Sequence, residues 1–505
     1  MKLEEISDLE TAKQVADLLQ RENERLHKRL AELTQENASL RGEKPAEQIE
    51  IELVRLQEQM HALQSKLFGA SSERRAEGKQ KTAKEPRERS RSTAQRDLPV
   101  DVVDHGIADD DRDCRSCGGS LEEWSGQFEE FEEVDIVERQ FRIKRHRRQK
   151  YRCRCGAAPV TAPGPVRIPG SEYSLDFAIT VAADKYNWHA PLERQAARME
   201  TEGLPIGSGT LWRQIELLGQ VLADTYDALG DYVVGADMLH VDETPWWLLK
   251  KGRQKWWAWT FSRHDAVVIR IDKSRGHHVP ATFLEGFEGL LAVDGYGAYK
   301  TLRKAFKGKV ELALCWSHAR RKLIEAEPAY PQVAPALELI RDLFLIEREL
   351  PDYRLLAGEQ RTAALAEIAQ VRKERAKPLV DELARWRREQ QALPQSKLGT
   401  ALAFFDNHWR DLTRFLRDPR APLSNNQAER SLRPTVVGRK NHYGSKSQRG
   451  TEIAELFYSL CGTCRMLGVN ANAYLRAAAE RALTEPGAVL LPHEFAGSVA
   501  PDDHR

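Results

Sequence analysis

The sequence predicts an α/β protein: a mixed sheet covered by helices, with a helical insertion in the later part of the chain. A coiled coil and a small cysteine-containing module are expected to precede this core. The main observations are leucines at heptad spacing before residue 68, close cysteine pairs between residues 99 and 165, and alternating β-rich and helical segments between residues 230 and 327. A chain of 505 residues has room for several such domains.

The composition narrows the class of protein only slightly. The 77 Lys and Arg residues nearly balance the 76 Asp and Glu residues, so net charge alone does not indicate a nucleic-acid partner. No apolar run approaches the roughly 18 residues of a membrane span, and no signal peptide precedes the cysteines. We therefore expect a cytoplasmic protein with reduced thiols and no membrane partner.

Residues 1–68 have the pattern of a coiled coil. Leucines recur at heptad spacing on one seam, and asparagines interrupt the other, which fixes register and strand number. The leucines are Leu19, Leu26, Leu33 and Leu40, and the asparagines are Asn23 and Asn37. We predict a homodimer, or a higher oligomer, formed through this segment. Because Pro45 interrupts the pattern, an intramolecular helical hairpin is the alternative.

Residues 69–98 are predicted to be a charged linker, because small and charged residues dominate and no apolar side chain could anchor the chain. A solvated tail is the simplest interpretation. An arm that follows DNA is the alternative.

Residues 99–165 are predicted to form a zinc ribbon that binds DNA. Two closely spaced thiolate pairs suit one tetrahedral structural zinc ion. The ligands would be Cys114, Cys117, Cys153 and Cys155. The second pair is CxC rather than CxxC, so incidental buried thiols are the alternative.

A basic segment lies between the cysteine pairs. Phe141 and Ile143 alternate with charged residues, as on a half-buried strand. Such a strand could contact phosphates, and a solvated strand face is the alternative. The predicted DNA-binding residues here are Arg142, Lys144, Arg145, Arg147 and Arg148.

The remaining segments are predicted in order from their hydrophobic patterns. Residues 166–229 are helical, with two short helices around a glycine-containing turn that resemble a helix-turn-helix, although plain helical packing explains the pattern equally well. Residues 230–327 form the first part of the core, residues 328–418 a helical insertion, and residues 419–460 the completion of the core. A helical element and a tail occupy residues 461–505.

Three carboxylates are candidate metal ligands. Asp242 and Asp294 are each expected at the end of a strand, and Glu429 on a helix that Asn425 can cap. Such a set suits two Mg²⁺ ions, with Mn²⁺ as an alternative, in an in-line displacement at phosphorus. Neighbouring residues on a strand point to opposite faces, so only one of Asp242 and its rival Glu243 should face the metal.

Several segments resemble motifs of the large transposase of the insertion-sequence 66 family. They are HVDETP (240–245), VDGYGAY (293–299), CWSHARRK (315–322) and NQAERSLRP (426–434) followed by GRKN (438–441). The paired cysteines and the segments around residues 67–73 and 468–475 extend the resemblance over most of the chain. The motifs are specific together rather than singly.

The resemblance implies a DDE transposase with an RNase H-like core, in which Asp242, Asp294 and Glu429 are the catalytic metal ligands. It favours Asp242 over Glu243. It also implies double-stranded DNA as the partner, both at the element's terminal repeats and at the target, together with small accessory proteins. A nucleoid-associated location in the cytoplasm follows from that partner.

Basic side chains flank Glu429, and guanidinium groups suit phosphate oxygens. We therefore expect contacts to DNA from Arg430, Arg433, Arg439 and Lys440. Ion pairs with the helical insertion are the alternative. The tryptophans between Trp246 and Trp259 are expected in the core rather than on a base-stacking surface.

The remaining Cys and His residues are expected to be structural. Cys315 and His318 would support the active site, with direct metal binding as the alternative. Cys461 and Cys464 are expected to be buried thiols rather than ligands of a second zinc ion. The alternative function is a zinc-containing dimeric DNA-binding regulator, or a catalytically inactive relative of a transposase.

Overall fold

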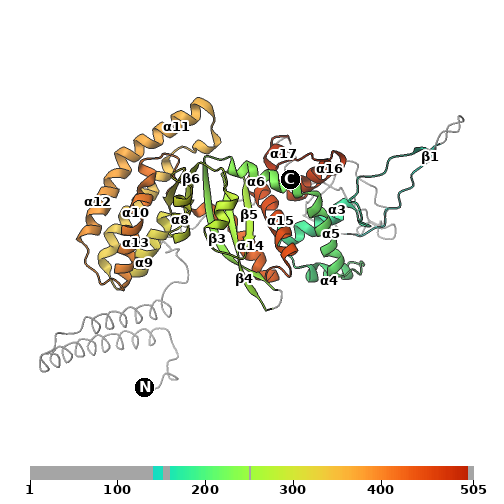
Figure 1. Cartoon of the computed structure of the whole chain (residues 1–505), viewed down its shortest axis with the longest axis horizontal. Coiled ribbons are helices and arrows are strands. Elements are labelled where there is room, and N and C mark those ends of the chain that lie inside the picture. The colour runs from blue at the N-terminus through green and yellow to red at the C-terminus, as the bar shows by residue number, and fades with distance from the viewer. Residues whose placement is uncertain (1–139, 152–159, 250–251, 499–505) are drawn as a thin grey trace, which may run out of the picture. The chain divides into compact units, whose positions relative to one another are not determined.

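The computed structural model describes residues 140–151, 160–249 and 252–498 (Figure 1). The predicted coiled coil, the charged linker and the four zinc-ligand cysteines therefore lie outside the described residues.

A five-stranded mixed sheet is the centre of the described chain, as predicted. Its strands are β3 (Met238–Leu248), β4 (Gln254–Ser262), β5 (Val267–Asp272), β6 (Gly289–Val293) and β7 (Val310–Leu314). They lie in the order β5-β4-β3-β6-β7. β3, β4 and β5 pair antiparallel, whereas β6 pairs parallel with both β3 and β7. Strands β6 and β7 are short and almost wholly apolar, which suits strands buried on both faces.

Helices follow the last three of these strands in chain order, one after each. They are α7 (His278–Phe283), α8 (Gly297–Ala305) and α9 (Trp316–Ala326). Trp246 and Trp259 are completely buried, and Trp256 and Trp257 are partly buried against the same core, as expected. Trp247 is only half-buried, and its ring lies under the guanidinium of Arg253.

The region before the sheet is helical, as predicted. Its helices are α3 (Leu175–Tyr186), α4 (Leu192–Thr201), α5 (Ser208–Val221) and α6 (Ala223–Val234). Gly203 turns the chain after α4 with φ +86°, a conformation that favours glycine. Helices α4 and α5 pack together, and their use as a helix-turn-helix stays a prediction.

Strand β5 is an edge of the sheet, and helix α15 (Gln448–Leu467) runs along it (Figure 1). The backbone N–H of Ile271 donates to Glu455 Oε1 at 2.9 Å. The N–H groups of Ile269 and Val267 donate to Ser459 Oγ at 2.8 Å and Thr463 Oγ1 at 3.1 Å. Residues four apart share one helix face, so α15 presents a ladder of acceptors to alternate residues of the strand. This acceptor ladder closes an edge that would otherwise expose unpaired N–H groups.

The chain between β7 and residue 416 is helical, and its role as an insertion into the core stays a prediction. The α-helices after α9 are α10 (Ala334–Glu349), α11 (Gly358–Val371), α12 (Lys377–Glu389) and α13 (Lys397–Leu412). Short 3₁₀ turns cover Pro331–Val333, Tyr353–Leu355 and Thr413–Leu416, and a π-helical segment, Arg372–Ala376, joins α11 to α12. Helices α14 (Asn426–His442), α16 (Ala471–Thr484) and α17 (Pro492–Ser498) complete the described chain.

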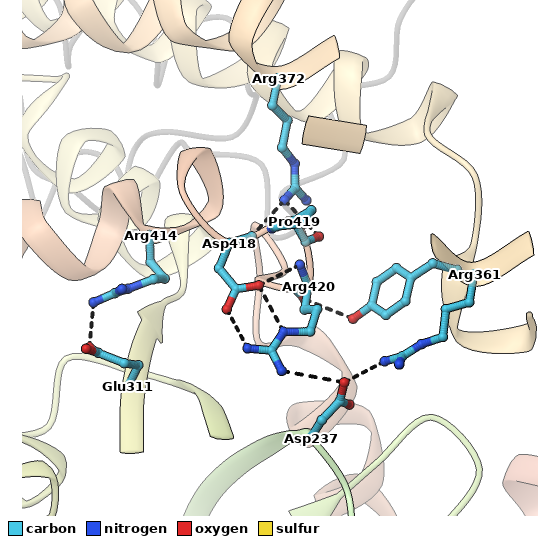
Figure 2. A network of polar contacts seen from close by, with 9 residues as sticks. Asp237, Glu311, Arg361, Arg372, Arg414, Asp418, Pro419 and Arg420 are labelled. Atoms are coloured by element: carbon cyan, nitrogen blue, oxygen red, sulfur yellow. Dashed lines mark hydrogen bonds and ion pairs between the residues drawn. The ribbon is translucent and has the colours of Figure 1, made fainter. Parts of the chain in front are cut away.

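A polar network joins these helices to the start of β3 (Figure 2). Asp237, just before β3, accepts from Arg361 of α11 and pairs with Arg420, which also binds Asp418. The buried Arg372 donates to the carbonyl oxygen of Pro419 at 3.1 Å. The network fixes the chain just ahead of α14.

The basic segment differs from the predicted half-buried strand. Regular pairing covers only β1 (Lys150–Tyr151) and β2 (Val160–Thr161). Phe141 is half-buried and packs against Phe177, but Ile143 is 96% exposed. The predicted alternation fails because no described element covers Ile143.

None of the helices that the structure describes combines the length and the apolar character needed to cross a bilayer.

Candidate functional site

Asp242 lies within a strand rather than at its end, which corrects the sequence-based expectation. The parallel pairing of β3 with β6 stops at His240 opposite Ala292, whereas its pairing with β4 continues to Leu248. Asp242 therefore comes just after the point where β3 loses its neighbour on the β6 side. Pro245 follows three residues later in β3, beyond the last residue that pairs with β6. A proline, which lacks an N–H, is tolerated there because the β6 side of the strand has no strand partner.

Asp294 immediately follows β6, as predicted. Its Oδ1 accepts the backbone N–H of Tyr296 at 2.8 Å, which fixes the turn into α8. Gly295 does not leave open space: a Cβ atom there would lie 2.5 Å from the Phe404 ring of α13. The glycine instead permits a close approach between this turn and α13.

Glu429 lies in the first turn of α14, and Asn425 precedes that helix. The Asn425 side chain does not cap the helix, contrary to the prediction. Its Nδ2 instead donates to the carbonyl oxygen of Val241 at 2.8 Å, and its Oδ1 lies 3.0 Å from His240 Nδ1. Burial lowers the pKa of His240 to about 4, so its ring is neutral and can donate through Nδ1. Asn425 thus ties the start of α14 to the strand that carries Asp242.

The three carboxylates are electrostatically coupled. The pKa of Asp242 is raised to about 7, first by burial and then by the charges of Glu243, Asp294 and Glu429. The backbone N–H of Glu243 donates to its Oδ1 at 2.9 Å and opposes this rise. A cation would relieve such an accumulation of like charge.

The carboxylates do not form a finished metal site. Across residues 140–151, 160–249 and 252–498, no group of three His, Cys, Asp or Glu side chains is close enough to hold an ion as it stands. Hard carboxylate oxygens are the donors that Mg²⁺ prefers, so the donor chemistry fits. Electrostatic coupling, rather than a complete coordination shell, links the three residues.

Glu243 has partners of its own. Its Oε1 accepts from Arg275 Nε at 2.9 Å, and its Oε2 accepts from the hydroxyl of Tyr299 at 2.6 Å. The Arg275 guanidinium stacks on Trp257 and Tyr296, 4.5 and 3.9 Å from the ring centroids. Burial still raises the pKa of Glu243, but the contacts with Tyr299 and Arg275 oppose that rise. This arrangement favours Asp242 as the residue left for a metal.

Cys315 and His318 lie beneath the start of α14. The backbone N–H of Asn425 donates to Cys315 Sγ at 3.1 Å, and His318 Nε2 lies 3.8 Å from Glu429 Oε1. Burial opposes ionisation of the Cys315 thiol, but the hydrogen bond with His318 lowers its pKa overall and raises that of His318. Both residues contact the elements that position Glu429, as a supporting role requires.

Cys461 and Cys464 are buried free thiols in α15, as predicted. Burial raises the pKa of Cys461 to about 12, which disfavours the thiolate that zinc requires.

The basic residues of α14 divide into two groups. Arg430, Arg433 and Lys440 are exposed on one helix face, together with Val437. Among the described residues none of these three has an ion pair, so the predicted alternative of pairing with the helical insertion is not observed. Arg439 differs, because it donates to Thr244 Oγ1 at 3.3 Å and is partly buried.

The predicted residues of the basic segment remain exposed. Arg142, Lys144, Arg145 and Arg147 extend into solvent, whereas Arg148 Nε donates to the carbonyl oxygen of Ala162 at 2.6 Å. Their contact with DNA stays a prediction.

Sequence reasoning missed two residues at this site. Asn425 was predicted only as a helix cap, and no local signal shows that its amide bridges to β3. Arg275 was not predicted at all. A buried glutamate next to a candidate ligand could have prompted the search for such a cation.

Comparison with known families and proteins gives consistent matches. A family described as "Transposase IS66 family" matches residues 170–453, which include Asp242, Asp294 and Glu429. A second, "zinc-finger binding domain of transposase IS66", matches residues 111–156, which include all four paired cysteines. Similar curated proteins come from Sinorhizobium fredii and are named as uncharacterized. Protein y4hP is 29% identical over 72% of this chain and 69% of its own length, and y4jD is 28% identical over 74% and 75%.

Proposed function

Because the chain belongs to the IS66 family of transposases, we propose that it cuts the ends of an insertion sequence and joins them to target DNA. The proposed catalytic residues are Asp242, Asp294 and Glu429, carried on an RNase H-like core. The observation that carries the proposal is the raised pKa of Asp242, to about 7, by burial and by surrounding carboxylates with little compensation from the chain. Carboxylates perturbed by neighbouring carboxylates cluster at functional sites.

The three carboxylates would hold two Mg²⁺ or Mn²⁺ ions. When bound, such ions stabilise charge on both the attacking and the leaving oxygen of a phosphoryl displacement. The chain's own contribution is positioning. Asn425 holds α14 against β3, the Asp294 carboxylate fixes the turn after β6, and the Arg275–Tyr299 pair occupies Glu243.

Basic residues would hold the DNA. Arg430, Arg433 and Lys440 lie on the helix whose first turn carries Glu429, and their side chains are free for phosphate contacts. Arg439 and the basic segment would add further contacts. One zinc ion, held by Cys114, Cys117, Cys153 and Cys155, would order the DNA-binding module.

The assembly would contain further components. We expect two or more copies joined through residues 1–68, double-stranded DNA at the element ends and target, and small accessory proteins. The reaction would take place in the cytoplasm, at the nucleoid.

The test is nicking of a supercoiled plasmid that carries the element's own ends, by the full chain with Mg²⁺. Asp294→Asn should reduce nicking to background. The matched control is Glu288→Gln, which alters an exposed carboxylate at the other end of β6 and should retain activity. If Asp294→Asn nicks as well as the parent protein, the catalytic assignment is wrong, and a non-catalytic DNA-binding regulator becomes the better interpretation.

A further inference from the structure

A second feature lies on α14, the helix that carries Glu429. A pocket of about 780 Å³ is formed by the turn between α3 and α4, the outer face of α14 and the turn between α15 and α16. This volume is in the range of pockets that bind small organic groups, roughly 300–1,000 Å³. Its lining includes Arg430, Arg433 and Arg465 but no Asp or Glu residue. The pocket is therefore suited to an anion.

Trp188 lines the same pocket and is 71% exposed, although large aromatic side chains are usually covered. Its turn is nevertheless firmly held. Arg465 Nη2 donates to the backbone and side-chain oxygens of Asn187 at 3.2 and 2.6 Å. Asn441 Nδ2 of α14 donates to the carbonyl oxygen of His189 at 3.2 Å.

The backbone beside Trp188 is also unusual. His189 has φ +61°, in the left-handed region that non-glycine residues rarely occupy. Strained backbone of this kind persists where surrounding contacts hold it, and it tends to occur at functional sites. The chain is thus held on both sides of Trp188, whose exposed ring lines a cationic pocket.

The cations and the ring are placed for a common ligand. Arg430 and Arg433 have no ion pair or hydrogen bond among the described residues, so their guanidinium groups are available. Arg430 follows Glu429 directly, so the pocket adjoins the candidate catalytic helix turn. Val437, 39% exposed, adds an apolar surface next to the arginines.

We propose that this pocket binds an unpaired nucleotide of the DNA substrate, with its base stacked on Trp188 and its phosphates on Arg430, Arg433 and Arg465. A base has an apolar face that an aromatic ring can cover, and its backbone carries the negative charge that guanidinium groups recognise. A nucleotide within an intact duplex offers no exposed face. The ligand is therefore a frayed or single-stranded segment near the cut. This assignment rests on the proposed function, because it takes DNA as the substrate.

The test is equilibrium binding by the full chain, measured by fluorescence anisotropy. Every protein carries Asp294→Asn, so that the DNA is not cut. The probes are a short labelled single strand of mixed sequence and a blunt duplex of the same length. Trp188→Ala should weaken single-strand binding about tenfold and leave duplex binding nearly unchanged. Trp188→Phe should retain most of the affinity, because a ring remains for stacking.

The charge contribution is tested separately. Arg433→Ala should weaken single-strand binding and reduce the slope of log K against log salt concentration by about 0.7, the change expected when one phosphate is no longer neutralised. The matched control is Arg481→Ala, which removes an exposed charge from α16 outside the pocket. It should change neither the affinity for the single strand nor the salt slope.

Two outcomes would overturn the proposal: unchanged single-strand binding by Trp188→Ala, or an equal loss of duplex and single-strand binding. Thermal melting of each variant establishes that it is folded. The nicking assay tests the proposed function separately: that function fails if Mg²⁺-dependent nicking survives Asp294→Asn. The binding measurements do not depend on that chemistry.

Discussion

Two carboxylates in this protein, the half-buried Asp242 and the buried Glu455, have the same raised pKa, about 7, for different reasons. Burial is the largest cause for both. Around Glu455, hydrogen bonds from Ile271 N–H and the Tyr226 hydroxyl, together with the charge of Arg270, oppose the rise. Around Asp242, further carboxylates add to the rise, and the opposing donor is the neighbouring backbone N–H of Glu243. Glu455 is therefore satisfied by the chain, whereas Asp242 is not.

The difference separates a structural carboxylate from a candidate catalytic one. The chain surrounds Glu455 with donors because its oxygens close the edge of the sheet. It supplies Asp242 with like charge, which destabilises the protein unless a cation binds. A raised pKa alone therefore does not identify the functional residue. The groups that surround the carboxylate identify it: donors indicate a structural role, and further carboxylates indicate a candidate metal ligand.

The largest expected effect separates activity from stability. Asp242→Asn should reduce Mg²⁺-dependent nicking to background. Without divalent ions, the variant should melt no lower than the parent protein, because it removes a negative charge that the neighbouring carboxylates repel. It should also lose the rise in melting temperature that Mg²⁺ gives the parent protein. A melting temperature well below that of the parent would mean that Asp242 is structural, and the contrast with Glu455 would not hold.

Glu455→Ala should have the opposite outcome. It leaves the Ile271 N–H without an acceptor and Arg270 without its partner, so the free energy of unfolding should fall by about 3 kcal/mol. Chemical denaturation measures the change. The matched control is Glu452→Ala, one turn earlier on the same helix and paired only at the surface, which should cost less than about 0.5 kcal/mol. Equal losses in the two variants would mean that the acceptor ladder does not stabilise the sheet edge.

Asn425→Ala tests whether positioning alone affects the candidate site. Since the amide ties α14 to β3 through Val241 and His240, nicking should fall about 10–100-fold, the usual range for residues that orient ligands. The apparent affinity for Mg²⁺ should fall with it. Asn426→Ala, at the exposed neighbouring position, is the control and should retain activity. Full activity in Asn425→Ala would show that the Glu429 helix does not depend on this tie.

Much of the fold could be predicted because its signals are local. Apolar periodicity indicated the alternation of strands and helices from β3 to α9, in the observed order. The acceptor ladder could not be predicted from the sequence, because Glu455, Ser459 and Thr463 accept from backbone N–H groups that lie 184, 190 and 196 residues away along the chain. Backbone partners have no sequence signature, so spacing alone cannot reveal such a ladder.

The site was predictable to a different extent. Asp242, Asp294 and Glu429 came from motif resemblance, since no spacing rule selects three carboxylates from 76 acidic residues. Their supporting residues could not be predicted, because Asn425 and Arg275 act across the fold. The exposure of Trp188 could not be predicted either, since it depends on tertiary packing.

The smallest expected effect, measured per pH unit, is a pH dependence that belongs to Glu455. Its pKa is about 7 in the folded protein, above the ordinary value of 4.5. The folded state therefore keeps a proton that the unfolded chain loses between those values, so the contribution of Glu455 to stability is fully present below pH 4.5 and is lost as the pH rises towards 7. The slope for one group is at most about 1.4 kcal/mol per pH unit. Glu455→Gln keeps an acceptor for Ile271 but cannot ionise, so its unfolding free energy should fall less steeply over this window. Ser459→Ala, which weakens the ladder without removing an ionisable group, should keep the parent slope. If the unfolding free energy of Glu455→Gln has the same pH slope as that of the parent protein, the Glu455 carboxylate is ionised in the folded state across this range. Arg270, rather than a proton, then balances its charge.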